Sequence, residues 1–334
     1  MNILVCGGAG YIGSHMVKML LLEGHNPLIF DDFSTGHLWA VKAAFRASGR
    51  EPRYIEGSLL DYEALNRCFG DCDIEAVMHF AAKSQVRESM SAPGLYYENN
   101  VFGTLNLLQN MVKAGIRHLI FSSTAAVYGL IQEMPIMDDA ATKPINPYGR
   151  SKLMAEQMMA DFALVHGLKI AALRYFNVAG AHPDGTLGED HRPESHLIPL
   201  VIKSALGKGP GIRIFGNDYD TPDGTCIRDY VHVEDLAAAH LSALTYLKRM
   251  EEGGFSTFNI GTGSGTSNLE VIQSVERVSG RKLDFSFAEP RPGDPPVLYA
   301  DASKALNVLN WRPLFTSLDD IISTALQAEI NLPR

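Results

Sequence analysis

Short apolar segments alternate with longer amphipathic segments along the first half of the chain. The apolar segments of strand length lie at 3–6, 27–30, 53–55, 76–80, 119–122 and 170–175. Helical periodicity lies between them, most clearly at 12–23, 99–113 and 148–166. Strands that alternate with helices pair in parallel, with helices on both faces of the sheet. The pattern therefore predicts an α/β fold built on a doubly wound parallel sheet.

The second half of the chain has a different pattern. Beyond about residue 177, proline, glycine and aspartate are scattered through 182–193, 207–224 and 290–296. Such residues interrupt regular elements and predict a smaller, loop-rich α/β lobe. Two later segments, 231–247 and 257–260, are apolar again and are expected to return to the main sheet.

Composition narrows the functional classes. The 334 residues can bury a large core, and the net charge of −9 argues against nucleic acid, because a phosphate backbone needs a basic face. No apolar run is long enough to span a bilayer, and the start of the sequence lacks the features of a signal peptide. The four cysteines form no Cys-x-x-Cys pair, which favours reduced thiols and a cytoplasmic location. The histidines form no common metal-binding motif, so no metal is expected.

A glycine-rich turn follows the first predicted strand. Gly7, Gly10 and Gly13 have the spacing Gly-x-x-Gly-x-x-Gly, and a helix is predicted directly after them. Such a turn lets backbone N–H groups approach a pyrophosphate at a helix N-terminus, as in a Rossmann-type dinucleotide site. Asp31, at the end of the second strand, is placed to accept hydrogen bonds from a ribose diol and to repel a 2′-phosphate. The glycine turn and Asp31 together predict NAD rather than NADP. The simpler alternatives are that the turn only connects a strand to a helix and that Asp31 is a solvated carboxylate.

Tyr148 and Lys152 lie one helical turn apart at the start of a predicted helix. Asn146 suits the N-cap and Pro147 the first helical position. Residues at i and i+4 share a helix face, with about 5–6 Å between their Cβ atoms. The helix dipole and the nearby ammonium are therefore expected to lower the pKa of Tyr148 and stabilise a phenolate that can act as a base. Because a tyrosine and a lysine at this spacing are common by chance, their assignment as a catalytic pair depends on the presence of the dinucleotide site.

Several longer motifs accompany this pair. They are FSSTAAVYG at 121–129, RYFN at 174–177, FGNDY at 215–219, RDYVHV at 228–233 and RPGD at 291–294. Together with the glycine turn and Tyr-x-x-x-Lys, they resemble the nucleotide-sugar epimerases of the extended short-chain dehydrogenase/reductase family over nearly the whole chain. The resemblance implies an isomerase that interconverts UDP-glucose and UDP-galactose, using bound NAD to oxidise C4 transiently to a 4-keto sugar.

The same resemblance implies how the chain is organised. It implies an NAD-binding Rossmann domain at 1–176 with returns from about 229–260, and a mainly substrate-binding lobe at 177–334. It also implies a homodimer, in which the helix at 99–113 and residues 154–163 of the next one could present apolar faces to a second subunit. Both faces could equally pack internally.

Individual roles also follow from the resemblance. Tyr148 would be the acid/base, Lys152 would hold the nicotinamide ribose, and Thr124 would hydrogen-bond the reacting 4-oxygen. The implied cofactor-binding residues are Gly7, Gly10, Tyr11, Ile12, Gly13, Asp31, Phe80, Ala81, Asn99, Ser122, Tyr148, Lys152 and Phe176. The implied substrate-binding residues are Thr124, Tyr148, Asn177, His196, Leu197, Phe215, Arg228, Arg291, Asp294 and Leu298.

Two of these residues have a physical argument of their own. The planar guanidinium groups of Arg228 and Arg291 suit a diphosphate. Ion pairs with the neighbouring Asp229 and Asp294 are the alternative. The chain also departs from the family pattern at Ser58 and His196, where an aspartate and an asparagine are common, and at Lys83, to which we assign no role. Thr124 keeps the hydroxyl of the serine that often stands there.

Two other functions use the same scaffold. A nucleotide-sugar 4,6-dehydratase needs an Asp-Glu pair directly after the threonine, where this chain has Ala125 and Ala126. A non-catalytic NAD sensor or scaffold would have no use for Tyr148 and Lys152. Leu298 occupies a position where a tyrosine excludes N-acetyl groups and smaller residues admit them. Its intermediate size raises the hypothesis that UDP-N-acetylhexosamines are also accepted.

Overall fold

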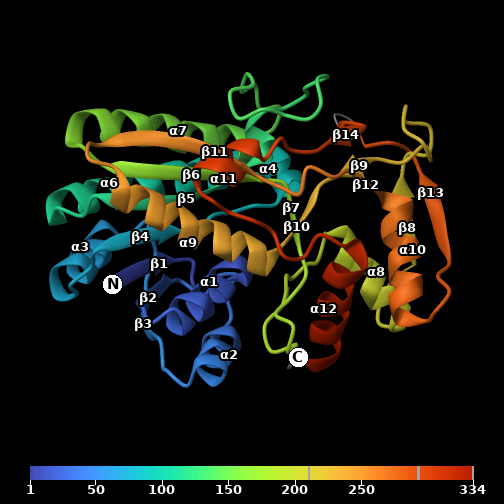
Figure 1. The fold of residues 1–334 in the computed structure, drawn as a ribbon, viewed down its shortest axis with the longest axis horizontal. Coiled ribbons are helices and arrows are strands. Elements are labelled where there is room, and N and C mark those ends of the chain that lie inside the picture. The colour runs from blue at the N-terminus through green and yellow to red at the C-terminus, as the bar shows by residue number, and fades with distance from the viewer. Residues whose placement is uncertain (210, 292–293, 333–334) are drawn as a thin grey trace.

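The alternation of apolar segments in the first half of the chain produces one parallel sheet. The computed structural model describes residues 1–209, 211–291 and 294–332. In that part of the chain the main sheet has seven strands in the order β3-β2-β1-β4-β5-β6-β11 (Figure 1). The strands are β1 (Asn2–Cys6), β2 (Asn26–Asp31), β3 (Arg53–Glu56), β4 (Ala76–His79), β5 (His118–Thr124), β6 (Lys169–Tyr175) and β11 (Gly254–Ile260). The first six follow the Rossmann strand order, which confirms the predicted fold class.

Each face of the main sheet is buried against helices because its strands are apolar on both sides. In β1, Ile3 and Val5 join one apolar cluster, whereas Leu4 and Cys6 join another. The first cluster includes residues of α1 (Tyr11–Leu22), α2 (Leu38–Ser48) and α9 (Val233–Arg249). The second includes residues of α3 (Tyr62–Asp71), α6 (Gly103–Ala114) and α7 (Pro147–His166). Among the described residues, no helix has both the length and the apolar character that a membrane span requires.

The two segments expected to return to the main sheet do so differently. Thr257–Ile260 lies within β11, which pairs with β6 at the sheet edge. Residues 233–249 form α9, which covers one face of the sheet. The start of the first segment belongs to β10 (Tyr230–His232), and β10 pairs with the short strand β7 (Asn177–Ala179) instead of the main sheet. The expectation of a sheet return was therefore wrong for β10.

The second lobe contains short strands around a separate apolar cluster. That cluster is formed largely by α8 (Leu197–Ala205), α10 (Asn268–Ser279) and α12 (Leu318–Asn331), which lie to the right of the main sheet in Figure 1. The strands are β8 (Ile212–Phe215), β9 (Ile227–Arg228), β12 (Thr266–Ser267), β13 (Phe285–Ala288) and β14 (Val297–Leu298). The remaining elements are α4 (Val86–Ser91), α5 (Pro93–Tyr96), the π-helix η1 (Tyr97–Phe102), the 3-10 turn η2 (Ala125–Val127) and α11 (Ser303–Val308).

Candidate active site

The glycine turn lies at the carboxyl end of β1 and is packed too tightly for larger residues. Gly7 has φ +80°, and a Cβ added to it would lie 2.5 Å from the backbone nitrogen of Ala81. A Cβ on Gly13 would lie 2.1 Å from the carbonyl oxygen of Gly7. The turn leads directly into α1. The N-cap residue of α1 is Gly10, so no side chain caps the first backbone N–H groups of the helix. An open helix N-terminus of this kind suits a pyrophosphate.

Asp31 connects this turn to the end of β2. Its carboxylate accepts hydrogen bonds from the backbone N–H of Ala9 at 2.9 Å and of Phe33 at 2.8 Å. Burial raises the pKa of Asp31, while these two hydrogen bonds act in the opposite direction. A carboxylate has about four lone-pair positions, so acceptor capacity remains for a ribose diol. The turn and the acid therefore fit the adenosine half of NAD.

Other residues predicted to line the cofactor site lie along the same sheet edge. Phe80 and Ala81 follow β4, and their backbone N–H groups donate to the carbonyl oxygen of Cys6 at 2.8 and 3.0 Å. Ser122 lies in β5, with its hydroxyl 2.8 Å from that of Tyr175. Phe176 follows β6 and is buried. Carboxyl ends of parallel strands are where such folds bind ligands. Asn99 comes from η1, and its amide donates to Asn100.

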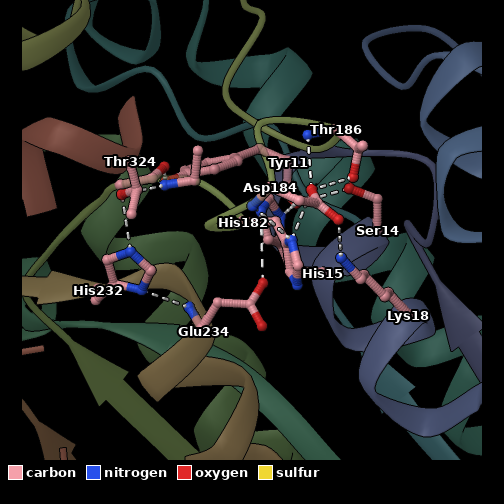
Figure 2. Close-up of polar contacts among 12 residues, drawn as sticks. Tyr11, Ser14, His15, Lys18, His182, Asp184, Thr186, His232, Glu234 and Thr324 are labelled. Atoms are coloured by element: carbon pink, nitrogen blue, oxygen red, sulfur yellow. Dashed lines mark hydrogen bonds and ion pairs between the residues drawn. The ribbon is translucent and has the colours of Figure 1, made fainter. Parts of the chain in front are cut away.

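Tyr11 and Ile12 form the first turn of α1, and Tyr11 also joins the turn to the second lobe. The Tyr11 hydroxyl donates to the carbonyl oxygen of Gly180 at 2.6 Å. Figure 2 shows this face of α1 against the loop after β7, where Lys18 is 3.5 Å from a carboxylate oxygen of Asp184. The loop that leads to α8 is therefore fixed directly beside the glycine turn.

The start of α7 brings the three predicted catalytic side chains together. The Asn146 side chain accepts a hydrogen bond from the Gly149 N–H at 2.8 Å, and Pro147 is the first helical residue, which confirms the predicted cap. Tyr148 is buried, and its hydroxyl is close enough to Thr124, at the end of β5, for that side chain to influence its pKa. One turn later, the Lys152 ammonium donates to the carbonyl oxygen of Ser122 at 2.8 Å. A tyrosine, a hydroxyl and a lysine thus meet where β5 ends.

The acidity of Tyr148 differs from the sequence-based expectation. Burial raises the pKa of Tyr148, and the nearby Thr124 side chain opposes this only in part. Burial also lowers the pKa of Lys152 to about 7, although Glu156 acts in the opposite direction. The expected lowering of the Tyr148 pKa by the helix dipole and the lysine was therefore wrong for the protein alone, because desolvation is the larger effect.

A buried polar network supports this site, and the sequence analysis did not identify it. Glu156, one turn beyond Lys152, accepts hydrogen bonds from Arg174 at 2.6 and 3.0 Å and from Ser123 at 2.5 Å. Arg174 also donates to the Tyr128 hydroxyl at 3.1 Å. The spacing Tyr-x-x-x-Lys-x-x-x-Glu was the available signal, because all three residues share one helix face.

Asn100 is a second residue that the sequence analysis missed. Its buried amide donates to Ser151 Oγ and to the Lys83 carbonyl oxygen, both at 2.9 Å, and it accepts from the Lys83 N–H at 2.9 Å. Lys83 therefore contributes its backbone here, while its ammonium lies 3.3 Å from Ser34 Oγ. Ser58, the other position without an assigned role, accepts a hydrogen bond from the Leu60 N–H at 3.3 Å.

Short strands of the second lobe bring five predicted substrate residues together. In the parallel pair of β14 and β9, Leu298 lies opposite Arg228. Arg228 forms an ion pair with Asp294 at 2.5 Å, and the guanidinium of Arg291 lies 4.0 Å from the centre of the Phe215 ring. Residues 292 and 293 of the RPGD motif are outside the described residues.

Asp229 has a different role from the ion pair considered above. Its buried carboxylate accepts backbone N–H groups from Thr262 at 2.8 Å, Gly263 at 3.0 Å and Ala300 at 3.1 Å. The alternative of an ion pair with Arg228 was therefore wrong for Asp229. Asp294 does form an ion pair with an arginine, as that alternative predicted, but its partner is Arg228 and not the neighbouring Arg291.

The remaining predicted substrate residues are spread over the border between the lobes. Leu298 packs in an apolar cluster with Ala125 and Phe176, next to the end of β5. Asn177 lies in β7 opposite Tyr230, and Leu197 is the first residue of α8. His196 forms ion pairs with Glu189 at 2.7 Å and Glu194 at 2.9 Å. These carboxylates outweigh partial burial and raise the pKa of His196 to about 10.

A doubly wound sheet with this turn, this acid and this tyrosine defines a class of enzymes that bind a nicotinamide dinucleotide and transfer a proton through a tyrosine. A family model described as "NAD dependent epimerase/dehydratase family" matches residues 3–261, and the chain belongs to that family. This membership confirms the predicted enzyme class and the NAD cofactor.

Individual relatives agree with this assignment. The chain is 46% identical to the UDP-glucose 4-epimerase of Lactobacillus helveticus. The identity extends over 325 residues, which are 97% of this chain and 96% of the relative. A crystal structure of UDP-glucose 4-epimerase from Brucella ovis with NAD is 46% identical, covers 97% of both chains and has a TM-score of 0.92. The UDP-Glc/GlcNAc 4-epimerase of Campylobacter jejuni is 42% identical, covers 99% of both chains and has a TM-score of 0.86.

Proposed function

We propose that the protein interconverts UDP-glucose and UDP-galactose by inverting C4 of the sugar. The observation that carries this proposal is the meeting of Thr124, Tyr148 and Lys152 at the end of β5, beside a glycine turn that fits NAD. NAD, when bound, supplies a hydride acceptor and donor for C4 and a positive charge that favours ionised Tyr148. Because no net oxidation occurs, the reaction needs no second redox substrate.

Each catalytic residue has one task in this proposal. Ionised Tyr148 takes the proton from the 4-hydroxyl, and the hydroxyl that this forms returns a proton to the 4-oxygen after the 4-keto sugar has turned over. Thr124, whose side chain lies close enough to Tyr148 to influence its pKa, orients the 4-oxygen toward that residue. Lys152 would hold the nicotinamide ribose and, when protonated, favour the phenolate. Among the predicted cofactor residues, we assign the pyrophosphate to the turn of Gly7, Gly10 and Gly13 and the ribose diol to Asp31.

The second lobe would hold the nucleotide while the sugar turns. We propose that Arg228 and Arg291 grip the diphosphate, with Asp294 and Phe215 fixing the two guanidinium groups in place. In this proposal the two parts of the chain bind different molecules. Residues 1–176, together with α9 and β11, bind NAD, and residues 177–334 mainly bind the UDP-hexose. A grip that is separate from the reacting carbon permits the sugar to present either face.

The 4,6-dehydratase alternative has less support. Elimination of water needs an acid and a base beside Thr124, and the residues there are Ala125 and Ala126, whose methyl groups transfer no protons. The decisive experiment incubates the purified protein with UDP-galactose and no added cofactor, and follows the sugar by NMR. UDP-glucose is the expected product. A product without its C6 hydroxyl would instead support dehydration, and no turnover would support a sensor or scaffold.

We also propose that UDP-N-acetylhexosamines are accepted, with Leu298 as the determinant. Leu298 packs against the apolar cluster that contains Ala125 and Phe176, and it is smaller than a tyrosine. Leu298→Tyr is expected to lower conversion of UDP-GlcNAc to UDP-GalNAc by about 10–200-fold, since one poorly fitting group is worth about 1–3 kcal/mol, while UDP-galactose, which has no N-acetyl group, is turned over nearly as before. NMR of both reactions measures the ratio; no activity of the unmodified protein on UDP-GlcNAc would refute this part alone.

We propose a homodimer formed through an apolar patch on η1, α6 and α7. The patch consists of Tyr97, Val101, Phe102, Leu105 and Met154. Phe102 is 50% exposed and Met154 43% exposed, which is unfavourable for large apolar side chains in water. Phe102→Glu is expected to give a monomer in analytical ultracentrifugation. Leu164→Glu, at an 85% exposed position on the other end of α7, is the matched control and should leave the mass unchanged. A monomeric unmodified protein would contradict the proposal.

A cytoplasmic location is proposed from the cysteines. All four, Cys6, Cys68, Cys72 and Cys226, are free thiols, as expected in a reducing compartment. Denatured protein prepared without reductant should therefore alkylate at all four positions. A pair that reacts only after reduction would argue against this location.

A further inference from the structure

The loop between β7 and α8 contains a cluster of side chains that the proposed reaction does not use as a group. Glu189, His191, Glu194 and His196 lie with one nitrogen or oxygen atom from each within 4.8 Å of the others. No metal is expected from the sequence, because its histidines form none of the common metal-binding motifs. The spacing Glu-x-His-x-x-Glu-x-His falls outside those motifs, and the loop geometry is needed to bring its members together.

The donor atoms of the cluster converge. His196 Nδ1 lies 2.7 Å from Glu189 Oε1 and 2.9 Å from Glu194 Oε1, and His191 Nδ1 lies 3.0 Å from Glu189 Oε1. Around a four-coordinate ion with bonds of about 2.1 Å, donor atoms lie about 3.4 Å apart. The observed spacing therefore needs only small side-chain movements to accept an ion.

One carboxylate oxygen in the cluster lacks a hydrogen-bond partner among the described residues. Glu194 Oε1 accepts the backbone N–H groups of Ser195 at 2.8 Å and His196 at 2.9 Å. Glu194 Oε2 is buried and accepts no hydrogen bond, and its side chain is only 5% exposed. This oxygen lies 3.9 Å from His191 Nδ1, a distance that allows an ion pair with a protonated imidazole but no hydrogen bond. A buried carboxylate oxygen without a donor is costly, and a cation is one way to satisfy it.

The surrounding structure holds the cluster firmly. The His191 ring packs edge-on to Tyr11 with ring centres 6.3 Å apart, and His37 contacts the carbonyl oxygen of Asp190 at 3.0 Å. The loop is also fixed at Asp184, which reaches Lys18 of α1 (Figure 2). The four donors are therefore presented by a loop that is anchored to the NAD-binding domain on one side and continues into α8 on the other.

We propose that Glu189, His191, Glu194 and His196 bind a divalent transition-metal cation, with Zn²⁺ as the first candidate. Two imidazole nitrogens and two carboxylate oxygens form a donor set that Zn²⁺ accepts, and the two carboxylates balance its charge. The cation locks the loop between β7 and α8 in place and so fixes the start of α8. The proposed site shares His196 with the predicted substrate-binding residues, but none of its four ligands is one of the predicted proton-transfer residues at C4.

The test uses the purified protein with its NAD retained. Zn²⁺ is added, excess is removed by gel filtration, and bound zinc is measured by mass spectrometry; Co²⁺ provides a d–d absorption spectrum as a second readout. The unmodified protein is expected to hold one Zn²⁺ per chain and to give an intense, low-symmetry Co²⁺ spectrum. Glu194→Gln and His191→Asn, made separately, are expected to lose both signals. His166→Asn, which removes an exposed histidine at the end of α7, is the matched control and should keep both.

Three outcomes would overturn the proposal. The first is that the unmodified protein binds no zinc. The second is that both cluster variants bind as much zinc as the unmodified protein. The third is a Co²⁺ spectrum typical of an ion surrounded by six water ligands. Retained NAD serves as the check of folding for each variant. If one cluster variant fails this check, the other decides the comparison.

Discussion

Tyr148→Phe is expected to reduce turnover of UDP-galactose by about 10²–10⁴-fold, the usual contribution of a positioned proton-transfer group. The substitution removes only the hydroxyl, which lies near Thr124. The buried ring, its edge-on contact with Tyr96 at 6.3 Å and the cap of α7 remain. NAD should therefore stay bound in the variant, and the loss should appear in kcat more than in KM.

A matched control isolates the effect of the hydroxyl. Tyr54→Phe removes the same group from an exposed tyrosine in β3 and should leave turnover unchanged. Steady-state rates and the NAD released on denaturation are measured for both variants. Full activity of Tyr148→Phe would contradict the proton-transfer role. Loss of NAD together with activity would indicate that the hydroxyl matters for the structure of the site instead.

Arg174→Met is expected to lower the free energy of unfolding by about 3–5 kcal/mol, the usual effect of removing one partner of a buried ion pair. The Arg174 side chain is 8% exposed and that of Glu156 is 3% exposed, with 2.6 Å between the nitrogen and oxygen. The substitution leaves the Glu156 carboxylate buried with Ser123 as its remaining donor. Denaturant unfolding of the NAD-bound protein measures the change.

The comparison needs one control and one double variant. Arg277→Met breaks an exposed ion pair between Arg277 and Asp319 and should not measurably change the unfolding midpoint. Adding Glu156→Gln to Arg174→Met removes the uncompensated charge and should restore part of the lost stability. A loss below about 1 kcal/mol for Arg174→Met would show that the network contributes little.

The parts of this structure that could be predicted from sequence are those set by local pattern. The apolar segments gave the strands of the main sheet to within a few residues, because strands buried on both faces have few polar residues. The cap at Asn146 and Pro147 was predictable because capping needs only neighbouring residues. The glycine turn was predictable for the same reason. The roles of the site residues remain predictions.

The parts that were not predictable depend on tertiary contacts. The ion pair of Arg228 and Asp294 joins residues 66 positions apart and depends on the pairing of β14 with β9. The raised pKa of Tyr148 results from burial, which spacing along a helix does not report. The pairing of β10 with β7 and the convergence of the Glu189–His196 loop have the same origin.

The central claim, inversion through reversible removal of hydrogen from C4, has one direct test. UDP-galactose carrying deuterium at C4 is incubated with the purified protein in ordinary water, and the product is examined by NMR and mass spectrometry. We expect UDP-glucose that keeps deuterium at C4 and its hydroxyl at C6, because the C4 hydrogen passes to bound NAD and back without exchange with solvent. UDP-glucose with hydrogen from water at C4 would rule out this transient oxidation.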